Sequence, residues 1–405
     1  MLHLSPLILA TEAPPVMEAR RWIAGVAFPP DRPLINLSQA APVEPPPEPL
    51  REAMAKMVRT EADSHLYGPV LGLPPLREEV AARWSTIYGG EIAPADVAVT
   101  AGCNQAFCAA MATLAAPGDA VLLPVPWYFN HKMWLDLAGI ETVPVPCGEG
   151  MLPDLDAARA RMHDRVRAIV LVTPNNPTGA EYPPDLIATF AGLARTHGAT
   201  LILDETYRDF HAVPGPPHGL FADPGWRDVL IHLYSFSKAF RLTGHRVGAV
   251  IAHPERLAQA EKFLDTVSIC APALGQKAAL WGLRNLADFV AGERAEILAR
   301  RAAIARAIAG LEGWRLLRCG AYFAYAEHPY AEPSDVLARR LVAEQSLLML
   351  PGTMFAPTRA DGGDGGAERQ LRMAFANVGA EGLTTVGARL ATVAEPALAT
   401  PAANA

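Results

Sequence analysis

The chain has 405 residues, with 35 basic and 42 acidic side chains and a formal net charge of −7. Hydrophobic residues make up 51% and charged residues 19%, which excludes a wholly disordered chain and allows a large core without disulfide or metal staples. The acidic balance argues against a nucleic-acid-binding protein. The chain contains no run of about 18 uncharged apolar residues, so no membrane span is predicted. The five cysteines form no C-x-x-C pair and the first residues lack the basic flank of an export signal, so we expect a cytoplasmic protein without a metal site.

The N-terminal region is rich in proline. Its first 45 residues mix prolines with short apolar runs and lead into the sequence APVEPPPEP, which we expect to stay extended, with regular structure beginning after it. Two amphipathic helices are predicted next, over about 50–58 and 76–87, because apolar side chains recur there at helical spacing.

Six short apolar runs follow, separated by helix-length amphipathic stretches. Their hydrophobic residues are continuous rather than alternating, which is typical of strands in a sheet that helices cover on both faces. The sequence therefore predicts an α/β fold with a mainly parallel sheet between layers of helices. The runs are VAVT (97–100), AVLL (120–123), AIVLVT (168–173), TLILD (200–204), VLIHLY (229–234) and GAVIA (248–252).

The pattern changes after about residue 272. Helical sequence rich in Ala, Leu and Arg runs to about residue 310, and the strand-like segment 313–327, a helix near 335–344 and a strand near 371–376 follow it. This order predicts a second, smaller α+β unit. The run DGGDGG (361–366) is expected to be a flexible acidic loop, and the small side chains of the last residues predict a frayed tail.

Lysine is rare in this chain, since only five of the 35 basic residues are lysines. Where only positive charge is needed, such a chain supplies arginine, so a lysine raises the question of what an amine does that a guanidinium cannot. Lys238 is the most informative, because it lies in SFSKAFRLTGHRVG, directly after the run 229–234.

Ligands of open α/β sheets bind beyond the carboxyl ends of the strands, and polar residues follow several of the runs. Gly102 allows a tight turn that would point the free amides of the next helix at an anion, although an ordinary strand-to-helix turn has the same sequence. The prolines of PNNPTG restrict the backbone around Asn176 and would hold its side chain in one direction for binding. The alternative is that this sequence forms an ordinary stiff loop. Asp204 closes an apolar run, so its carboxylate needs a cationic or hydrogen-bonding partner.

The segment after the run 229–234 brings together two hydroxyls, an amine and a guanidinium. Ser235 and Arg246 would suit a phosphate, and a partly buried Lys238 amine would attack a carbonyl to form an imine, unless the lysine lies on a solvated turn. One small phosphorylated aldehyde satisfies all the strand ends, with its phosphate near Gly102, its carbonyl carbon on Lys238 and a ring nitrogen on Asp204. The sequence therefore predicts a pyridoxal phosphate site.

In the order and spacing of these motifs, the chain resembles the fold-type I, class I/II pyridoxal-phosphate aminotransferases from about residue 67 to 375. The resemblance implies a seven-stranded-type sheet in a large domain (46–275) and a small C-terminal domain (276–394), with the N-terminal segment (1–45) joining the small domain and capping the site and residues 395–405 forming a flexible tail. The residues that it places around the cofactor are Gly102, Cys103, Asn104, Tyr128, Asn176, Asp204, Tyr207, Ser235, Ser237, Lys238, Arg246 and, lent across a homodimer interface, Tyr67.

The resemblance also implies a role for each of these side chains. Lys238 would bind the cofactor and then move a proton between the substrate α-carbon and the cofactor, and Asp204 would pair with the ring nitrogen. Tyr207 and Asn176 would bond the phenolic oxygen of the ring. Tyr128, in PVPWYFNH, matches the aromatic residue that stacks on the ring.

Substrate contacts come from the two ends of the matched region. Arg372, in LRMAFA, aligns with the arginine that binds the α-carboxylate, a task that suits its paired donors. In LINLSQAAP, Gln39 and Ala40 align with a segment that caps the substrate. We expect a neutral or aromatic substrate side chain, because no second cation for an acidic side chain can be identified and several aromatic residues are available to line the pocket. These are Trp22, Phe28, Trp127, Tyr322 and Phe355.

The predicted reaction moves an amino group from an L-amino acid to a 2-oxo acid with ping-pong kinetics. The same machinery also serves lyases, and a carbon–sulfur β-lyase is the alternative enzyme. An alternative from another class is a regulatory module that kept the fold without turnover, but such regulators append a basic DNA-binding domain, and the 66 residues before Tyr67 contain one lysine.

Overall fold

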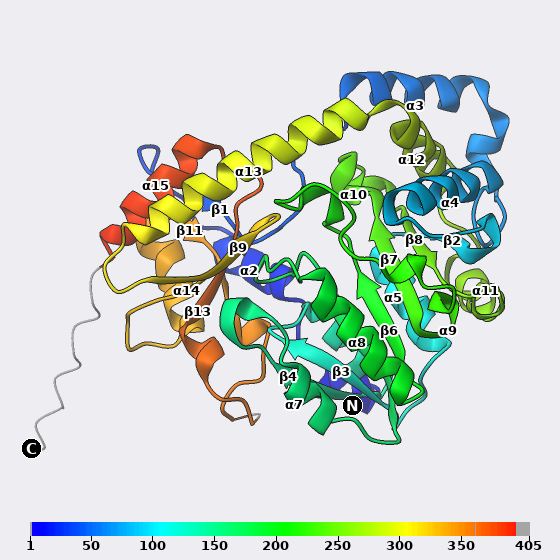
Figure 1. Cartoon of the computed structure of the whole chain (residues 1–405). Coiled ribbons are helices and arrows are strands. Elements are labelled where there is room, and N and C mark those ends of the chain that lie inside the picture. Colours follow the sequence, from blue (N-terminus) through cyan, green and yellow to red (C-terminus); the bar gives the residue numbers. More distant parts are fainter. Residues whose placement is uncertain (1, 361, 394–405) are drawn as a thin grey trace, which may run out of the picture.

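The computed structural model describes residues 2–360 and 362–393 (Figure 1). The predicted tail (395–405) and Asp361 of the predicted acidic loop lie outside the described residues.

A seven-stranded sheet forms the centre of the larger part of the molecule, as predicted. The strands lie parallel except β8, which runs antiparallel to both of its neighbours, β2 and β7. Six of the strands contain or closely match the predicted apolar runs, and the runs at 97–100 and 200–204 coincide with β2 and β6. In the order of the sheet, the strands are β2 (Val97–Thr100), β8 (Gly248–Ile251), β7 (Leu230–Ser235), β6 (Thr200–Asp204), β5 (Val166–Val172), β3 (Ala120–Val125) and β4 (Glu141–Pro146).

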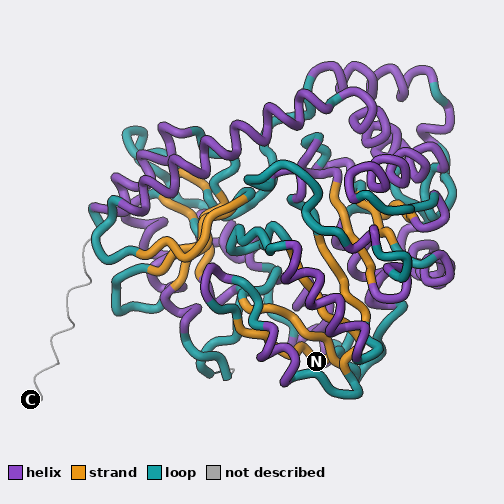
Figure 2. The backbone as a smooth tube through the Cα atoms, in the orientation of Figure 1, coloured by secondary structure: helices purple, strands orange, loops and turns teal. Residues whose placement is uncertain are grey.

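Both faces of this sheet are covered, as the continuous apolar runs predict (Figure 2). Along β3, Leu122 packs with side chains of α4, α8 and α12, whereas its neighbours Val121 and Leu123 pack with side chains of α5 and α6 on the other face. The helices of this part are α3 (Glu48–Thr60), α4 (Pro74–Tyr88), α5 (Cys103–Ala112), α6 (Phe129–Leu137), α7 (Leu155–Ala160), α8 (Pro184–Thr196), α9 (Trp226–Val229), α10 (Phe236–Ala239), α11 (Pro254–Ser268) and α12 (Ala273–Asn285).

A second sheet of four antiparallel strands, in the order β12-β13-β10-β9, has its own hydrophobic cluster and gives the α+β unit that the sequence predicts. In Figure 1 the long helix α13 runs from the side of α3 and α12 to α15, so it spans both parts of the molecule. The elements of this part are α13 (Ala287–Ala309), β9 (Arg315–Gly320), β10 (Phe323–Glu327), α14 (Ser334–Gln345), β11 (Leu347–Leu348), β12 (Leu350–Pro351), β13 (Gln370–Ala374) and α15 (Ala380–Ala391).

Regular structure begins earlier than predicted, at residue 6 rather than after the proline-rich segment. The N-terminal region forms α1 (Pro6–Ala10), α2 (Pro15–Ile23) and β1 (Ile35–Asn36). Both helices start at a proline, where a missing N–H costs no hydrogen bond, so prolines that look like breakers begin helices here. β1 pairs with β11 in a separate two-stranded sheet, and β11 ends two residues before β12 begins, so this region is attached to the smaller part of the molecule.

The five cysteines are free thiols, as expected from their spacing. Among the described residues, no helix combines the length and the hydropathy needed to cross a lipid bilayer.

Candidate active site

The predicted cofactor residues gather at one edge of the large sheet. Asp204 and Ser235 end β6 and β7, and Asn176 follows β5, so the carboxyl ends of three neighbouring parallel strands place them together. Arg246 lies two residues before β8. Because β8 is antiparallel to β7, its amino end lies at the edge where the other strands have their carboxyl ends, and the arginine joins the same site.

A pocket with about 640 Å³ of empty space opens at this edge. Of the residues predicted around the cofactor, Gly102 and Tyr67 do not line the pocket. Gly102 lies directly behind it, whereas Tyr67 is 78% exposed at the surface. The pocket is lined by Cys103, Asn104, Tyr128, Val172, Asn176, Asp204, Thr206, Tyr207, Ser235, Ser237, Lys238 and Arg246.

One side of the pocket is a cradle for an anion. Gly102 has φ +87°, and a Cβ there would stand 2.2 Å from Nη2 of Arg246, so only glycine lets the guanidinium lie against the turn. The same glycine precedes α5 without a capping side chain, which leaves the first amides of the helix, at Cys103 and Asn104, facing outward. Ser235 adds a hydroxyl that accepts a hydrogen bond from the backbone N–H of Ser237 at 3.3 Å. Amides, hydroxyls and a guanidinium are the donor set that a phosphate prefers.

Asp204 has the donor partners that its buried position requires. Its carboxylate is 3% exposed, lies 3.2 Å from Nε2 of His131, and accepts a hydrogen bond from the backbone N–H of Thr206 at 3.0 Å. Burial alone would raise the pKa of Asp204, but the hydrogen bond and the charge of His131, together with Thr206, hold the pKa below its usual value. The carboxylate therefore stays ionised, as a partner for a protonated ring nitrogen must.

Lys238 lies in the pocket with a weakly held proton. Burial and the neighbouring charge of Arg246 lower the pKa of the Lys238 amine to about 8. Its Nζ donates a hydrogen bond to the backbone carbonyl of Ala40 at 2.8 Å and lies 5.7 Å from the ring centre of Tyr207. The amine is therefore partly neutral near physiological pH, as a nucleophile must be.

Arg372 reaches the same site from the second sheet. It lies on β13, is 1% exposed, and donates to the side-chain oxygen of Asn176 at 3.0 Å and to the backbone carbonyl of Ser38. Among the described residues, its Nε has no hydrogen-bond partner. Burial lowers the pKa of the guanidinium to about 10, and the side chain packs over the rings of Phe323 and Phe355. A buried cation with a spare donor is suited to a substrate carboxylate.

A second pocket, with about 830 Å³ of empty space, adjoins the first. It extends from Lys238 and Arg372 to the N-terminal region, where Gln39 and Ala40 line it. Five of its lining residues also line the first pocket, so the two are continuous; these are Asn104, Tyr128, Asn176, Tyr207 and Lys238.

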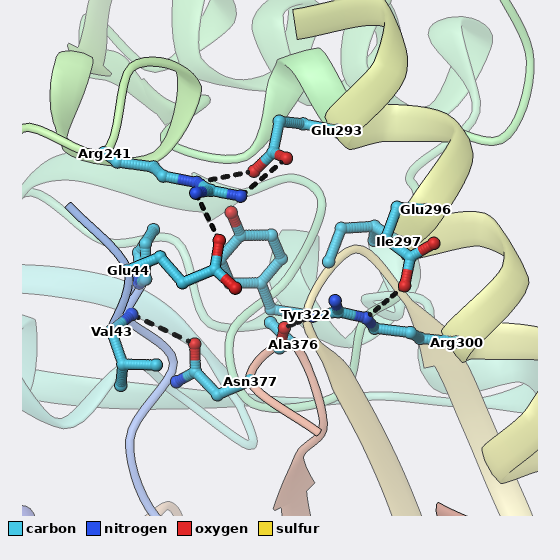
Figure 3. A pocket seen from close by; sticks show the side chains of 11 residues that line it. Val43, Glu44, Arg241, Glu293, Glu296, Ile297, Arg300, Tyr322, Ala376 and Asn377 are labelled. Carbon is cyan, nitrogen blue, oxygen red and sulfur yellow. Dashed lines mark hydrogen bonds and ion pairs between the residues drawn. The ribbon is translucent and has the colours of Figure 1, made fainter. Parts of the chain in front are cut away.

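Residues 40–44, here called the strap, lead from the second pocket, which Ala40 and Ala41 line, toward α3. Figure 3 shows two of these residues, Val43 and Glu44, beside Arg241 and Asn377. The backbone N–H of Val43 donates to Oδ1 of Asn377 at 3.2 Å, and Nδ2 of Asn377 donates to the carbonyl of Ala41 at 2.6 Å. Arg241 forms an ion pair with Glu44 and a bidentate pair with Glu293 of α13 at 2.8 and 2.9 Å. The strap is thereby held by residues of both parts of the molecule.

The aromatic residues expected in the substrate pocket lie elsewhere. Trp22, Phe28, Trp127, Tyr322 and Phe355 do not line the second pocket, and Tyr322 and Phe355 are buried in the core. The aromatic residues that do line it are Tyr128, Phe129 and Tyr207. Tyr128 donates a hydrogen bond to Oδ1 of Asn104 at 3.2 Å, and its ring meets that of His131 edge-on.

Sequence reasoning missed three residues that the structure brings to the site. His131 stacks on Phe107 with ring centres 3.9 Å apart and faces Asp204. Its position three residues after Tyr128, one turn along a helix, is the signal that was available. Thr206 was missed because nothing in the sequence ETYRDF marks it as a partner of Asp204, and Arg20 was missed because it lies in the proline-rich region.

A buried polar cluster lies beside Asp204 but outside both pockets. Glu205 accepts hydrogen bonds from Tyr88 and from Nε2 of His232 at 2.8 Å, and Nε2 of His218 is 3.6 Å away. Nδ1 of His218 accepts a hydrogen bond from the backbone, so its Nε2 carries the proton and faces the carboxylate as a donor. The three side chains are close enough to hold a metal ion, but their hydrogen bonds indicate a structural network around one carboxylate.

Comparisons with known proteins agree with this geometry. The family model of class I and II aminotransferases matches residues 32–390. The aspartate/prephenate aminotransferase of Thermus thermophilus is 29% identical over 341 residues, which cover 80% of this chain and 84% of that protein. The aromatic aminotransferase ISS1 of Arabidopsis thaliana is 27% identical over 361 residues, 86% of this chain and 88% of that protein.

The fold is also found in solved structures. The aspartate aminotransferase of Thermus thermophilus with maleate superimposes with a TM-score of 0.87 and 25% identity, covering 96% of this chain and 99% of that one. A match over most of the chain, together with a sheet edge that presents a lysine, an aspartate and an anion cradle, shows the family. The chain belongs to the class I and II aminotransferases, the pyridoxal-phosphate-dependent transaminases of fold type I.

Proposed function

We propose that this aminotransferase moves the amino group of an L-amino acid with a neutral or aromatic side chain to a 2-oxo acid, by ping-pong kinetics on a pyridoxal phosphate bound to Lys238. The observation that carries the proposal is the meeting of a lysine of lowered pKa, an ionised buried aspartate and a buried arginine in two continuous pockets.

The chemistry of the first pocket fits the cofactor. Gly102, Cys103, Asn104, Ser235, Ser237 and Arg246 would hold its phosphate, Asp204 its ring nitrogen, and Asn176 and Tyr207 its phenolic oxygen, while Tyr128 would pack on the ring. When bound, pyridoxal phosphate supplies an aldehyde that condenses with amines and a protonated ring that withdraws electrons.

Lys238 has two tasks in this scheme. Its pKa of about 8 leaves about a tenth of the amine neutral at pH 7, enough to react with an aldehyde. Once a substrate amine has displaced it, the same Nζ would accept a proton from the substrate α-carbon and deliver it to the cofactor. The hydrogen bond from Nζ to the Ala40 carbonyl supports this role, since a carbonyl can only accept and so leaves the lone pair of the neutral amine available.

Arg372 fixes the substrate by its α-carboxylate. The donor and the product 2-oxo acid both carry this group, and one buried guanidinium serves both in turn, which is the requirement of ping-pong turnover. Asn176 already accepts one hydrogen bond from Arg372 and so holds the plane of the guanidinium.

The proposed neutral or aromatic donor rests on the wall of the second pocket. Pro14, Val16, Met17 and Phe129 line it with apolar surface, which suits such a side chain. The relative from Arabidopsis thaliana is named for aromatic substrates, in keeping with this choice. A strong preference for aspartate or glutamate over methionine or phenylalanine as the amino donor would contradict it.

The proposal includes a homodimer in the cytoplasm, in which each subunit lends Tyr67 to the phosphate of its neighbour. Tyr67 and Leu66 are 78% and 64% exposed, which supports a covering partner. The proposed domains are 46–275 and 276–394, with residues 1–45 as the segment that caps the site. Retention of full cofactor affinity by Tyr67→Phe, or a monomer that is fully active, would contradict the lent tyrosine.

Lys238→Ala tests the central assignment. We expect the variant to lose transamination and the absorbance of lysine-bound cofactor, whereas Lys262→Ala, which removes a lysine from the outer helix α11, keeps both. Borohydride reduction of the loaded protein followed by peptide mapping should find the cofactor on Lys238 alone. Retained activity in Lys238→Ala, or a label on another residue, would refute the assignment, and release of pyruvate and ammonia from cystathionine without a 2-oxo acid would favour the β-lyase.

A further inference from the structure

The strap, residues 40–44, is an extended segment with few backbone partners. Prolines within it and directly after it keep it extended, because the residue before a proline is disfavoured in helical conformations. Within the described chain, two side chains hydrogen-bond the backbone of the strap. One is Lys238, which donates to the Ala40 carbonyl at 2.8 Å, and the other is Asn377. Because Lys238 is the residue proposed to bind the cofactor, Asn377 is the partner that is left to hold the strap in place.

Asn377 binds this segment with both ends of its side-chain amide. Its Oδ1 accepts a hydrogen bond from the backbone N–H of Val43 at 3.2 Å, a contact that Figure 3 shows. Its Nδ2 donates to the carbonyl of Ala41 at 2.6 Å and to that of Gln39 at 3.4 Å. The reversed amide would place its oxygen against two carbonyl oxygens, so this orientation alone satisfies all three backbone groups. The side chain thus takes the place of a neighbouring strand.

These contacts continue a seam that begins at β13. The backbone N–H of Ala374 donates to the carbonyl of Leu37 at 2.8 Å, and the Arg372 guanidinium donates to the carbonyl of Ser38. Asn377 follows Ala374 by three residues and binds the next part of the same segment. The chain that carries Arg372 therefore also determines where the strap lies.

The strap forms part of the wall of the second pocket. Gln39, Ala40 and Ala41 line that pocket, whereas Asn377 does not. Ala40 lies between the two residues whose carbonyls Asn377 binds, so the amide fixes the position of Ala40 from both sides. Asn377 therefore acts on the pocket through the strap and without touching a substrate.

The other anchor of the strap is weaker. Glu44 pairs with Arg241, but its side chain is 63% exposed, and ion pairs in contact with solvent contribute little. Arg241 is also held by two hydrogen bonds to Glu293, so it keeps a partner when Glu44 is removed. The position of the strap therefore depends mainly on Asn377.

We propose that Asn377 is a positioning residue of the transamination, which holds the strap as a fixed wall of the substrate pocket for the amino donor and the 2-oxo acid in turn. This inference rests on the proposed function and adds a residue to it. A wall that is ordered before a substrate arrives spares the complex the entropy cost of ordering it. Without Asn377, each substrate has to order the strap when it binds.

Steady-state kinetics of two variants test this role. We expect Asn377→Ala to raise the KM of the donor and of the 2-oxo acid together, by about ten-fold or more, because three hydrogen bonds are lost and both substrates use one pocket. The kcat should fall by no more than about three-fold, since Lys238 and Asp204 are carried by the large sheet. Asn377→Asp has the same shape but turns an oxygen toward two carbonyls, so its KM values should rise at least as much.

Two control variants accompany them. Asn285→Ala removes a side-chain amide on α12 that donates to the carbonyl of Trp281 at 2.8 Å, and it should leave both KM values unchanged. Glu44→Gln removes the exposed ion pair and should raise them by less than about three-fold. Wild-type KM values in Asn377→Asp would mean that the side chain only fills space, and would overturn the inference. A KM that rises for one substrate alone would overturn it too.

Two measurements do not depend on turnover. Hydrogen exchange of the cofactor-free protein should show the Val43 amide exchanging about ten-fold faster or more in Asn377→Ala than in the wild type. Hydrocinnamate, a carboxylic acid with an aromatic side chain and no amine, is titrated into the loaded enzyme by calorimetry, and Asn377→Ala should weaken its binding by about ten-fold. Thermal melting checks that each variant is folded.

The outcomes separate this inference from the proposed function. Unchanged exchange at Val43, or unchanged affinity for hydrocinnamate in Asn377→Ala, would overturn the role of Asn377. Absence of transamination by the wild type with every donor, while both differences persist, would refute the proposed function but leave Asn377 as the residue that holds the pocket wall.

Discussion

We expect Lys238 to lower the stability of the folded protein when no cofactor is bound. The pKa of its amine falls from 10.5 to about 8 in the folded chain, so holding the proton there costs free energy that the unfolded chain does not pay. At about 1.4 kcal/mol for each pKa unit, this shift would destabilise the folded chain by about 3 kcal/mol if the amine were fully buried. The pocket is open to solvent, and removing the amine also loses the hydrogen bond to Ala40, which is worth about 1 kcal/mol. We therefore expect Lys238→Met to raise the free energy of unfolding by about 1–2 kcal/mol at pH 7.

The pH dependence gives the sharper test. Because the pKa of Lys238 is lower in the folded than in the unfolded chain, the unfolded chain binds more protons between about pH 8 and 10.5, and the stability of the wild type rises through this window relative to the variant. The difference in free energy of unfolding between Lys238→Met and the wild type should therefore be constant below about pH 8 and vanish as the pH approaches 10.5.

Urea unfolding of the cofactor-free protein, followed by tryptophan fluorescence at a series of pH values, measures both effects. Lys262→Met is the control, since a surface lysine on α11 should change the free energy of unfolding by no more than about 0.5 kcal/mol. A Lys238→Met variant that is less stable than the wild type at pH 7, or whose advantage does not change up to pH 10, would refute the reasoning.

Three further substitutions probe the surroundings of the amine. His131→Phe removes a hydrogen bond that lowers the pKa of Asp204, so the acid limb of the pH–activity profile should move to higher pH, and an unmoved limb would contradict the role of His131. Gly102→Ala puts a Cβ 2.2 Å from Nη2 of Arg246 at φ +87°, and a fluorescence titration should show cofactor affinity reduced by about ten-fold or more; an unchanged dissociation constant would show that the cradle does not hold the phosphate. Glu205→Ala leaves buried donors without their acceptor and should cost about 3–5 kcal/mol in urea unfolding, and a loss below about 1 kcal/mol would mean that the cluster is not a structural support.

The large sheet could be predicted because its strands are buried on both faces, and β2 and β6 have the predicted bounds for that reason. The edge strand β4 was missed, since its sequence ETVPVP contains two prolines and only Val145 is buried, which does not give a continuous apolar run. The reversed direction of β8 could not be predicted either. The direction of β8 depends on which strands pair in space, and the apolar run GAVIA does not indicate whether the strand lies parallel or antiparallel to its neighbours.

In the candidate site, too, some residues could be predicted from the sequence and others could not. Asp204 and Lys238 could be singled out because Asp204 ends a strand and Lys238 lies three residues beyond one, where local sequence determines position. His131 and Arg20 could not, because their places in the site depend on which way a helix face turns and on how the N-terminal region docks. The early start of regular structure has a similar cause, since a proline fits both the first turn of a helix, as in α1 and α2, and an extended chain, and the local sequence does not distinguish the two.

Because β8 is reversed, one short connection of the large sheet supplies several groups of the site, whereas Arg372 comes from the second sheet. The groups proposed to hold the cofactor's phosphate and aldehyde come mainly from the short connection between two neighbouring strands of the large sheet, Ser235 to Arg246. If the two parts of the molecule rotated slightly relative to each other, the proposed contact of Arg372 with a substrate would change, whereas the proposed cofactor contacts, which come from the large sheet and its connections, would not.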